Sequence, residues 1–242
     1  QQRIEEIIAA AKLADELGLD VFGLGESHQE NFVSQAHTVI LGAIARETKQ
    51  IQLSSSASIV STTDPVRLYE EFATIDLLSN GRAEIVGGRA SRVGLFELLG
   101  YDLKDYEALF EEKFELLNQL NKNEPITWSG EFRAPLNEAV LYPKPLNGPI
   151  PIWRAVGGPA ASAMRAGAAG VPMMLATLGG PADLFNESID AFRMYADHYN
   201  HGPLPVGVTA LFHVADDKPS ALRNFYPYVD LAFRSATGTG FS

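Results

Sequence analysis

Residues 64–91 read DPVRLYEEFATIDLLSNGRAEIVGGRAS, and this stretch decides the expected fold because it places a helix, a turn and a buried strand in succession. Asp64 suits a helix N-cap, and Pro65 suits the first helical position, where no amide hydrogen is needed. The apolar residues that follow recur at the spacing of one helix face, and an Asn-Gly pair ends the helix. The run AEIVGG at 83–88 then predicts a buried strand that ends in the polar cluster GGRAS.

The same alternation of helix and strand extends in both directions along the chain. Further helices are expected at residues 3–17, 35–47, 104–121 and near 182–200. Six strands are expected in all, at residues 20–26, 51–58, 83–88, 150–158, 171–180 and 206–215. Strands that alternate with helices form a parallel sheet, so we expect an α/β fold in a single domain over residues 1–242.

The ends of the expected strands favour a closed barrel over an open sheet. Five strands are followed by polar or glycine-rich clusters, which read GESH, SSSAS, GGRAS, VGG and TLGG. Because barrel enzymes build their sites at the carboxyl ends of parallel strands, these clusters fit one shared mouth. An open dinucleotide-binding sheet would show the motif G-x-G-x-x-G, and GLGESH at 23–28 has His28 at the third glycine position. We therefore expect a (β/α)8 TIM barrel whose first and last strands lie outside residues 1–242.

Residues 125–151 interrupt this pattern, and we expect them to form an insertion in the barrel. Six prolines fall within the segment, which disfavours both helices and central strands. The part that reads ITWSGEF, at 126–132, predicts a small hairpin, and the rest is expected to be extended loop.

The composition limits the partners and the chemistry of this protein. The formal net charge is −11, and a chain this acidic is not expected to bind nucleic acid or an anionic membrane. No apolar run approaches the length of about 20 residues that spans a bilayer. The chain has no cysteine, its five histidines lack H-E-x-x-H spacing, and G-x-S-x-G is absent. We therefore expect no metal site and no thiol or serine nucleophile. For the location of the protein, the cytoplasm is the simplest expectation.

The segment VGGPAAS at 156–162 predicts a site for an anion. It follows a strand and opens an Ala-rich helix, whose first amides have no partner within the helix and lie at the positive end of the helix dipole. Gly157 and Gly158 allow a ligand to approach the backbone closely, and Ser162 adds a hydroxyl group. The alternative is a tight turn with a serine near the helix cap.

Two long stretches resemble the family of bacterial-luciferase-like, flavin-dependent monooxygenases. They are the stretch quoted first and GGPAASAMRAGAAGVPMMLATLGG, and GESH occupies the place where this family often has an acid and paired histidines. The resemblance covers about residues 4–215 and implies a (β/α)8 barrel with an insertion. It implies that FMN, or in some members coenzyme F420, is the cofactor, and that reduced flavin and O2 oxidise a small organic substrate. A separate flavin reductase is implied as a partner, and we further expect a homodimer.

The resemblance also assigns roles to residues around the flavin phosphate. Gly157, Gly158 and Ser162 are implied to hold the phosphate. Arg89 is implied to contact it, because an arginine can meet a phosphate with two parallel hydrogen bonds. Ala90 and Ser91 are implied to line the cofactor. The alternative for Arg89 is a surface arginine that pairs with an acid.

Two further assignments concern the flavin ring. A non-prolyl cis peptide that supports the ring in this family falls, by position, at Ser56–Ala57, although a Ser-rich loop is an alternative account of SSSAS. His28 matches the second of two adjacent histidines in luciferases and is the candidate catalytic residue, as a hydrogen-bond donor or an acid–base group. Ser27 stands where luciferases have the first histidine, which questions luciferase-type base chemistry, and a structural role for His28 is the alternative.

Three other functions remain open at the level of the sequence. An F420-dependent enzyme that transfers a hydride would share the barrel and also presents a phosphate. A non-catalytic flavin-binding protein would fit the small number of strands. A barrel enzyme that acts on phosphorylated sugars would need no flavin at all, because a fold does not by itself give a function.

Overall fold

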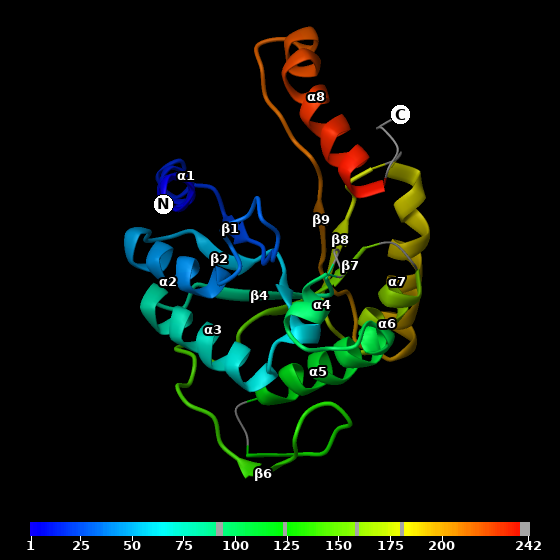
Figure 1. Ribbon diagram of the computed structural model, residues 1–242. Coiled ribbons are helices and arrows are strands. Elements are labelled where there is room, and N and C mark those ends of the chain that lie inside the picture. Colours follow the sequence, from blue (N-terminus) through cyan, green and yellow to red (C-terminus); the bar gives the residue numbers. More distant parts are fainter. Residues whose placement is uncertain (91–93, 123–124, 158–159, 180–181, 238–242) are drawn as a thin grey trace.

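The computed structural model of the chain describes residues 1–90, 94–122, 125–157, 160–179 and 182–237 (Figure 1). Its central feature is a curled parallel sheet in the order β1-β2-β4-β7-β8-β9, with β3 paired to β4. The strands are β1 (Val21–Leu24), β2 (Gln52–Ser55), β3 (Ser58–Ile59), β4 (Ala83–Gly88), β7 (Ile152–Val156), β8 (Met173–Ala176) and β9 (Val206–Thr209). Each of the six predicted strands is present, and all of the pairings between them are parallel.

Helices alternate with the strands. The helices of the described chain are α1 (Gln2–Glu16), α2 (His37–Glu47), α3 (Pro65–Ser79), α4 (Leu95–Leu98), α5 (Tyr106–Leu120), α6 (Ala160–Ala168), α7 (Asn186–His198) and α8 (Lys218–Thr237). Of these, α2, α3, α5, α6 and α7 lie along the outside of the curled sheet (Figure 1). Short 3-10 turns lie at Val60–Thr62, Leu103–Asp105 and Ala182–Phe185. The expected cap of α3 is confirmed, since the side chain of Asp64 accepts hydrogen bonds from the amides of Val66 and Arg67.

The sheet curls as a barrel does but is not closed within the described part of the chain. There, β1 pairs only with β2, and β9 pairs only with β8. The strand predicted at 20–26 is therefore an edge strand that lacks a neighbour on one side, and Val21 is 51% exposed. The main apolar core lies instead where α2, α3 and α5 pack against β2 and β4.

Arg82, at the start of β4, is buried and joins three elements through main-chain carbonyls. Its guanidinium group donates hydrogen bonds to the carbonyl oxygens of Ala45, Thr48, Ile51 and Ser79 and to the hydroxyl of Thr48. These contacts lie at the amino ends of the strands. They stabilise the end of the sheet opposite to the polar clusters, which follow the carboxyl ends of the strands.

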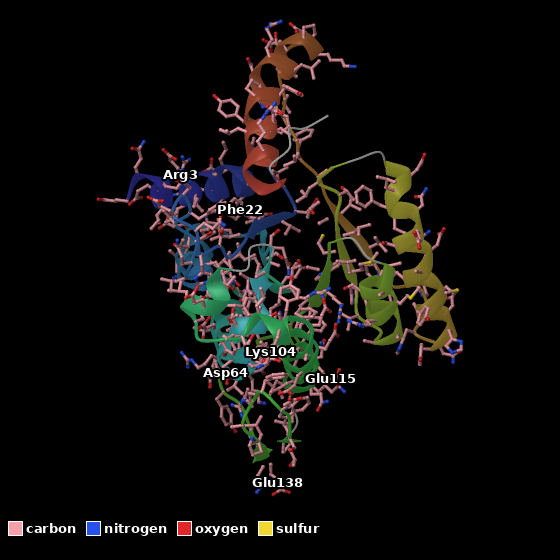
Figure 2. The ribbon with its side chains drawn as sticks, turned by 45° about the vertical axis from the view of Figure 1, so that its right-hand side comes forward. Arg3, Phe22, Asp64, Lys104, Glu115 and Glu138 are labelled. Carbon is pink, nitrogen blue, oxygen red and sulfur yellow. The ribbon has the colours of Figure 1, made fainter. Side chains whose placement is uncertain are left out.

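The insertion and the last helix differ from the expectation. The hairpin pairs β5 (Ile126–Trp128) with β6 (Leu136–Ala139), so its second strand comes later than ITWSGEF, after a wider loop. Figure 2 shows this insertion, with Glu138, at the end of the molecule away from Phe22 of β1. The sequence does not predict α8, because Pro227 lies inside it and proline disfavours a helix interior. In Figure 1, α8 stands apart from the other helices.

Candidate functional site

A cavity of about 460 Å³ lies at the carboxyl ends of the strands. Residues from the ends of β1, β2, β4, β7, β8 and β9 line it together with the segment before α4: Glu26, Ser27, His28, Gln29, Ser56, Ala57, Ile59, Val86, Arg89, Ala90, Gly94, Leu95, Ala155, Met174, Ala176, Leu178 and Thr209. The strand ends thus share one mouth, as their polar clusters predicted.

The candidate residues from the sequence fall into three groups. His28, Ser56, Ala57, Arg89 and Ala90 line the cavity. Ser162 is buried in the first turn of α6 and reaches the cavity through a hydrogen bond from Arg89, whereas Gly157 is exposed and does not line it. Ser91 and Gly158 lie outside the described residues.

The peptide bond between Ser56 and Ala57 is cis, as the resemblance implied. Glycines of two neighbouring strand ends make room for this bond. A Cβ atom on Gly25 would lie 2.5 Å from the carbonyl oxygen of Ser56, and one on Gly88 would lie 3.0 Å from the Cβ atom of Ala57. The sequence pattern of small residues at these strand ends therefore has a steric cause.

Glu26 organises the end of β1, and the sequence reasoning missed it as a site residue. Its side chain is 6% exposed, and Oε1 lies 2.7 Å from Nε2 of His28. Oε2 accepts a hydrogen bond of 2.7 Å from the amide of Ile59, just beyond the cis peptide. Because an ionised carboxylate is only an acceptor, Nε2 of His28 carries the hydrogen of this bond. The acid in GESH was the signal that could have identified it.

His37 extends this cluster into the core. It is the first residue of α2, and its Nε2 lies 2.7 Å from the hydroxyl of Ser58, while Nδ1 lies 3.9 Å from Oε2 of Glu26. Burial, with a smaller effect from the charge of His28, lowers the pKa of His37 to about 4. His37 is therefore neutral at neutral pH.

Arg89, just past β4, connects the cavity to the turn before α6. Its Nη2 donates a hydrogen bond of 3.3 Å to the hydroxyl oxygen of Ser162, and its Nη1 pairs with the carboxylate of Glu107. The guanidinium group lies over the rings of Tyr106 and Phe110. Arg89 thus faces the cavity and pairs with an acid, and its contact with a phosphate stays a prediction.

A second buried arginine lies behind Ser162. Arg154 of β7 is 3% exposed, donates two hydrogen bonds to Glu111 of α5, and places Nε 3.4 Å from the hydroxyl oxygen of Ser162. Arg165 of α6 contacts Glu107 and Glu111, which lie one helical turn apart on α5. We call Arg89, Arg154, Arg165, Glu107 and Glu111 the arginine cluster. It carries one excess positive charge, which suits an anion.

Apart from Arg89, the members of the arginine cluster were missed by the sequence reasoning, although one signal was available. Arg154 is a charged residue in the middle of an apolar strand, IPIWRAV, where a charge requires a partner. Burial opposes ionisation of Glu111 and is the largest single influence on it. Hydrogen bonds and charge from Arg154 and Arg165 together outweigh burial, so the pKa of Glu111 lies below its usual value.

A model of the luciferase-like monooxygenase family matches residues 1–240. The chain belongs to this family. The resemblance is thereby confirmed, and the match covers more of the chain than the expected residues 4–215.

Two curated relatives illustrate the range of this luciferase-like family. The chain is 26% identical over 218 residues to N-acetyl-S-alkylcysteine monooxygenase of Bacillus subtilis, which covers 88% of the chain and 60% of the relative. It is also 26% identical over 195 residues to F420-dependent glucose-6-phosphate dehydrogenase of Amycolatopsis mediterranei, and this alignment covers 76% of the chain and 56% of the relative. The chain thus spans three fifths or less of the length of these relatives.

Two solved structures show the same luciferase-like fold. The monooxygenase RslO1 from Streptomyces bottropensis aligns with a TM-score of 0.89 and 24% identity, over 98% of this chain and 74% of that one. The oxygenating constituent of 3,6-diketocamphane monooxygenase from Pseudomonas putida, in complex with FMN, aligns with a TM-score of 0.80 and 18% identity, over 97% and 71%. The expected α/β barrel class is confirmed by these alignments.

The remaining expectations for this luciferase-like chain concern metals, histidines and membranes. Among the described residues, no group of three or more His, Cys, Asp or Glu side chains could hold a metal ion. The strand expected at 206–215 is shorter than predicted, because β9 ends at Thr209, and the ring of His213, beyond it, stacks on Phe225 of α8. No helix in the described part of the chain is long and apolar enough to cross a membrane.

Proposed function

We propose that this luciferase-like protein binds FMN in the cavity at the strand ends and oxidises a small organic substrate with reduced flavin and O2. The observation that carries the proposal is the contact between Arg89 and Ser162, 3.3 Å apart, which joins the cavity to the first turn of α6. A guanidinium group, a hydroxyl and a helix N-terminus together form a donor set for a phosphate.

The residues of the cavity fit a flavin in charge and in shape. The arginine cluster offers one excess positive charge beside the helix N-terminus in an otherwise acidic chain. Ala57, Ala90, Ala155 and Ala176 line the cavity with small side chains, which leave room for a flat ring against the backbone. In the mechanism, Arg89 and Ser162 would hold the phosphate, and the alanine-lined wall with the Ser56–Ala57 peptide would support the ring.

The other lining residues suit a reaction from which water is excluded. Bound reduced FMN would supply the electrons that activate O2. Ile59, Val86, Leu95 and Met174 give the cavity an apolar lining that keeps water from the reacting atoms. His28, held at Nε2 by Glu26, would accept or return a proton at its other ring nitrogen, next to the substrate.

We also propose the partners that the resemblance implies. A separate reductase would supply reduced flavin, which is supported by the description of the 3,6-diketocamphane relative as an oxygenating constituent. The protein would act as a homodimer, which light scattering of the purified protein tests directly.

F420 is the second candidate cofactor, because one curated relative is an F420-dependent dehydrogenase. Both cofactors carry a phosphate, so the arginine cluster does not favour either of them. With F420 the protein would transfer a hydride and would not consume O2.

A titration with FMN, F420 and riboflavin distinguishes these functions. We expect FMN to bind more tightly than riboflavin and F420, as followed by flavin fluorescence, and we expect reduced FMN on the protein to react with O2. Preferential binding of F420 would favour the dehydrogenase. Binding of FMN without oxidation of any substrate in a broad organic panel would favour a flavin-binding protein, and no binding of either cofactor would contradict the proposal.

A further inference from the structure

We propose that Arg154 is a positioning residue that aims the hydroxyl hydrogen of Ser162 at the cofactor phosphate. The inference rests on the proposed function, because it concerns the same phosphate site. Arg154 itself lies behind the site and does not line the cavity.

The hydrogen-bond capacity of Ser162 is the first step. A serine hydroxyl has one hydrogen to donate and two lone pairs that accept. Two guanidinium groups donate to the oxygen of Ser162, with distances of 3.3 Å from Nη2 of Arg89 and 3.4 Å from Nε of Arg154. An arginine has no acceptor, so the hydroxyl hydrogen cannot point at either of them. Both lone pairs are then in use. Among the described residues no acceptor takes the hydroxyl hydrogen, which is left for an acceptor such as a phosphate oxygen.

The rigidity of Arg154 is the second step. Its side chain is 3% exposed and donates to both carboxylate oxygens of Glu111, at 2.9 Å from Nη1 and 2.5 Å from Nη2. Its guanidinium plane also lies over the rings of Phe110 and Phe114. With the outer nitrogens held by Glu111, Nε is fixed toward Ser162. Lysine cannot reproduce this arrangement, because its ammonium group lacks the planar fork.

The two arginines therefore have different roles at one hydroxyl. Arg89 lines the cavity and would meet the phosphate itself. Arg154 approaches from the outer side of β7 and would act only through Ser162. This difference predicts how the effects of substitutions combine, because a residue that acts through another has no effect once the other is removed.

A double-mutant cycle with FMN and riboflavin as probes tests the inference. We expect Ser162→Ala and Arg154→Lys each to weaken FMN binding about tenfold, and riboflavin binding by no more than about twofold. Riboflavin lacks the phosphate and reports on the rest of the site. In the Ser162→Ala background, Arg154→Lys should weaken FMN binding by less than about twofold further. Losses that multiply in the double variant would overturn the inference.

A second variant keeps the test valid if Arg154→Lys fails to fold. Arg154→Met combined with Glu111→Leu removes both charges of this partly buried pair, so the net charge of the arginine cluster is unchanged, and apolar replacement of buried ion pairs is often tolerated. We expect this double substitution to weaken FMN binding by the same tenfold. In the Ser162→Ala background it should weaken FMN binding by less than about twofold further. The matched control is Arg82→Lys, at another buried arginine, which should lower stability and leave the ratio of FMN to riboflavin affinity unchanged.

The outcomes also separate this inference from the proposed function. If the unaltered protein binds FMN and riboflavin equally, no phosphate is held at this turn, and both are wrong. If it prefers FMN but the losses multiply, or if Arg82→Lys changes the preference as much as Arg154→Lys does, only the inference is wrong.

Discussion

His28 and Glu26 form a hydrogen-bonded pair past the end of β1, with 2.7 Å between Nε2 of His28 and Oε1 of Glu26. The other oxygen of Glu26 accepts from the amide of Ile59, so one carboxylate holds both the candidate catalytic side chain and the chain beyond the cis peptide. The position of His28 therefore depends on the same group that fixes the wall of the cavity.

Glu26→Ala should destabilise the protein by about 1–3 kcal/mol, because the amide of Ile59 loses its hydrogen-bond partner. Glu26→Gln retains one carbonyl acceptor and should cost less. Urea denaturation measures both changes, with Glu5→Ala on the exposed face of α1 as the control, expected within about 0.5 kcal/mol of the unaltered protein. Equal midpoints for Glu26→Ala and Glu5→Ala would contradict the role assigned to Glu26.

His37 should make the protein less stable in mild acid. The pKa of His37 is about 4 in the folded state, against about 6.5 in the unfolded chain. Between these values the unfolded state binds more protons, so the free energy of unfolding falls as the pH falls. Between pH 7.5 and pH 5, protonation of this group in the unfolded chain should lower the free energy of unfolding by about 2 kcal/mol.

The measurement is urea denaturation of the unaltered protein and of His37→Gln at several pH values. Between pH 7.5 and pH 5, the free energy of unfolding of His37→Gln should fall by about 2 kcal/mol less than that of the unaltered protein, because glutamine does not take up a proton. His198→Gln, at an exposed histidine in the last turn of α7, should keep the original pH dependence. An unchanged slope for His37→Gln would show that other groups cause the acid sensitivity.

Arg89→Ala should weaken FMN binding by about 1.5–3 kcal/mol and leave riboflavin binding almost unchanged, because the lost interaction is with the phosphate. Glu107→Gln should strengthen FMN binding, since it removes the carboxylate that competes for Nη1 of Arg89. Fluorescence titrations with both flavins measure these effects, and Arg67→Ala on α3 is the control. If Arg89→Ala weakened FMN and riboflavin equally, Arg89 would act through the fold and not through the phosphate.

Gly25→Ala should destabilise the protein by about 1–3 kcal/mol and weaken flavin binding, because the new Cβ atom would lie 2.5 Å from the carbonyl oxygen of Ser56. The backbone at the cavity wall would have to shift. Gly94→Ala is the control at a glycine that lines the cavity, where a Cβ atom meets nothing within 4 Å. Thermal unfolding and FMN titration of the two variants should differ clearly, and similar behaviour would refute the steric account.

Local patterns predicted the elements of this fold well. The helix at 65–79 and the strand at 83–88 appear at those residues, because capping and apolar spacing are properties of neighbouring residues. The turn residues at strand ends also predicted a shared mouth, since parallel strands place their carboxyl ends at one edge. The hairpin in the insertion was predicted with its second strand too early, because a loop of variable length joins the two strands.

The sequence by itself determined the order of the six main strands and of most helices, the barrel class, the family and the residues that line the cavity from single strand ends, such as His28, Ala57 and Arg89. Only the tertiary structure decided that Glu26 holds His28, and that Arg154 and Arg89 meet at Ser162. The contacts of Arg89 with Ser162 and of Arg154 with Glu111 join residues that are 73 and 43 positions apart in the chain, so no local pattern links them. The physical reason is that a buried charge requires a partner, but the partner can come from any part of the chain. Only the folded structure determines which side chain comes within hydrogen-bond distance.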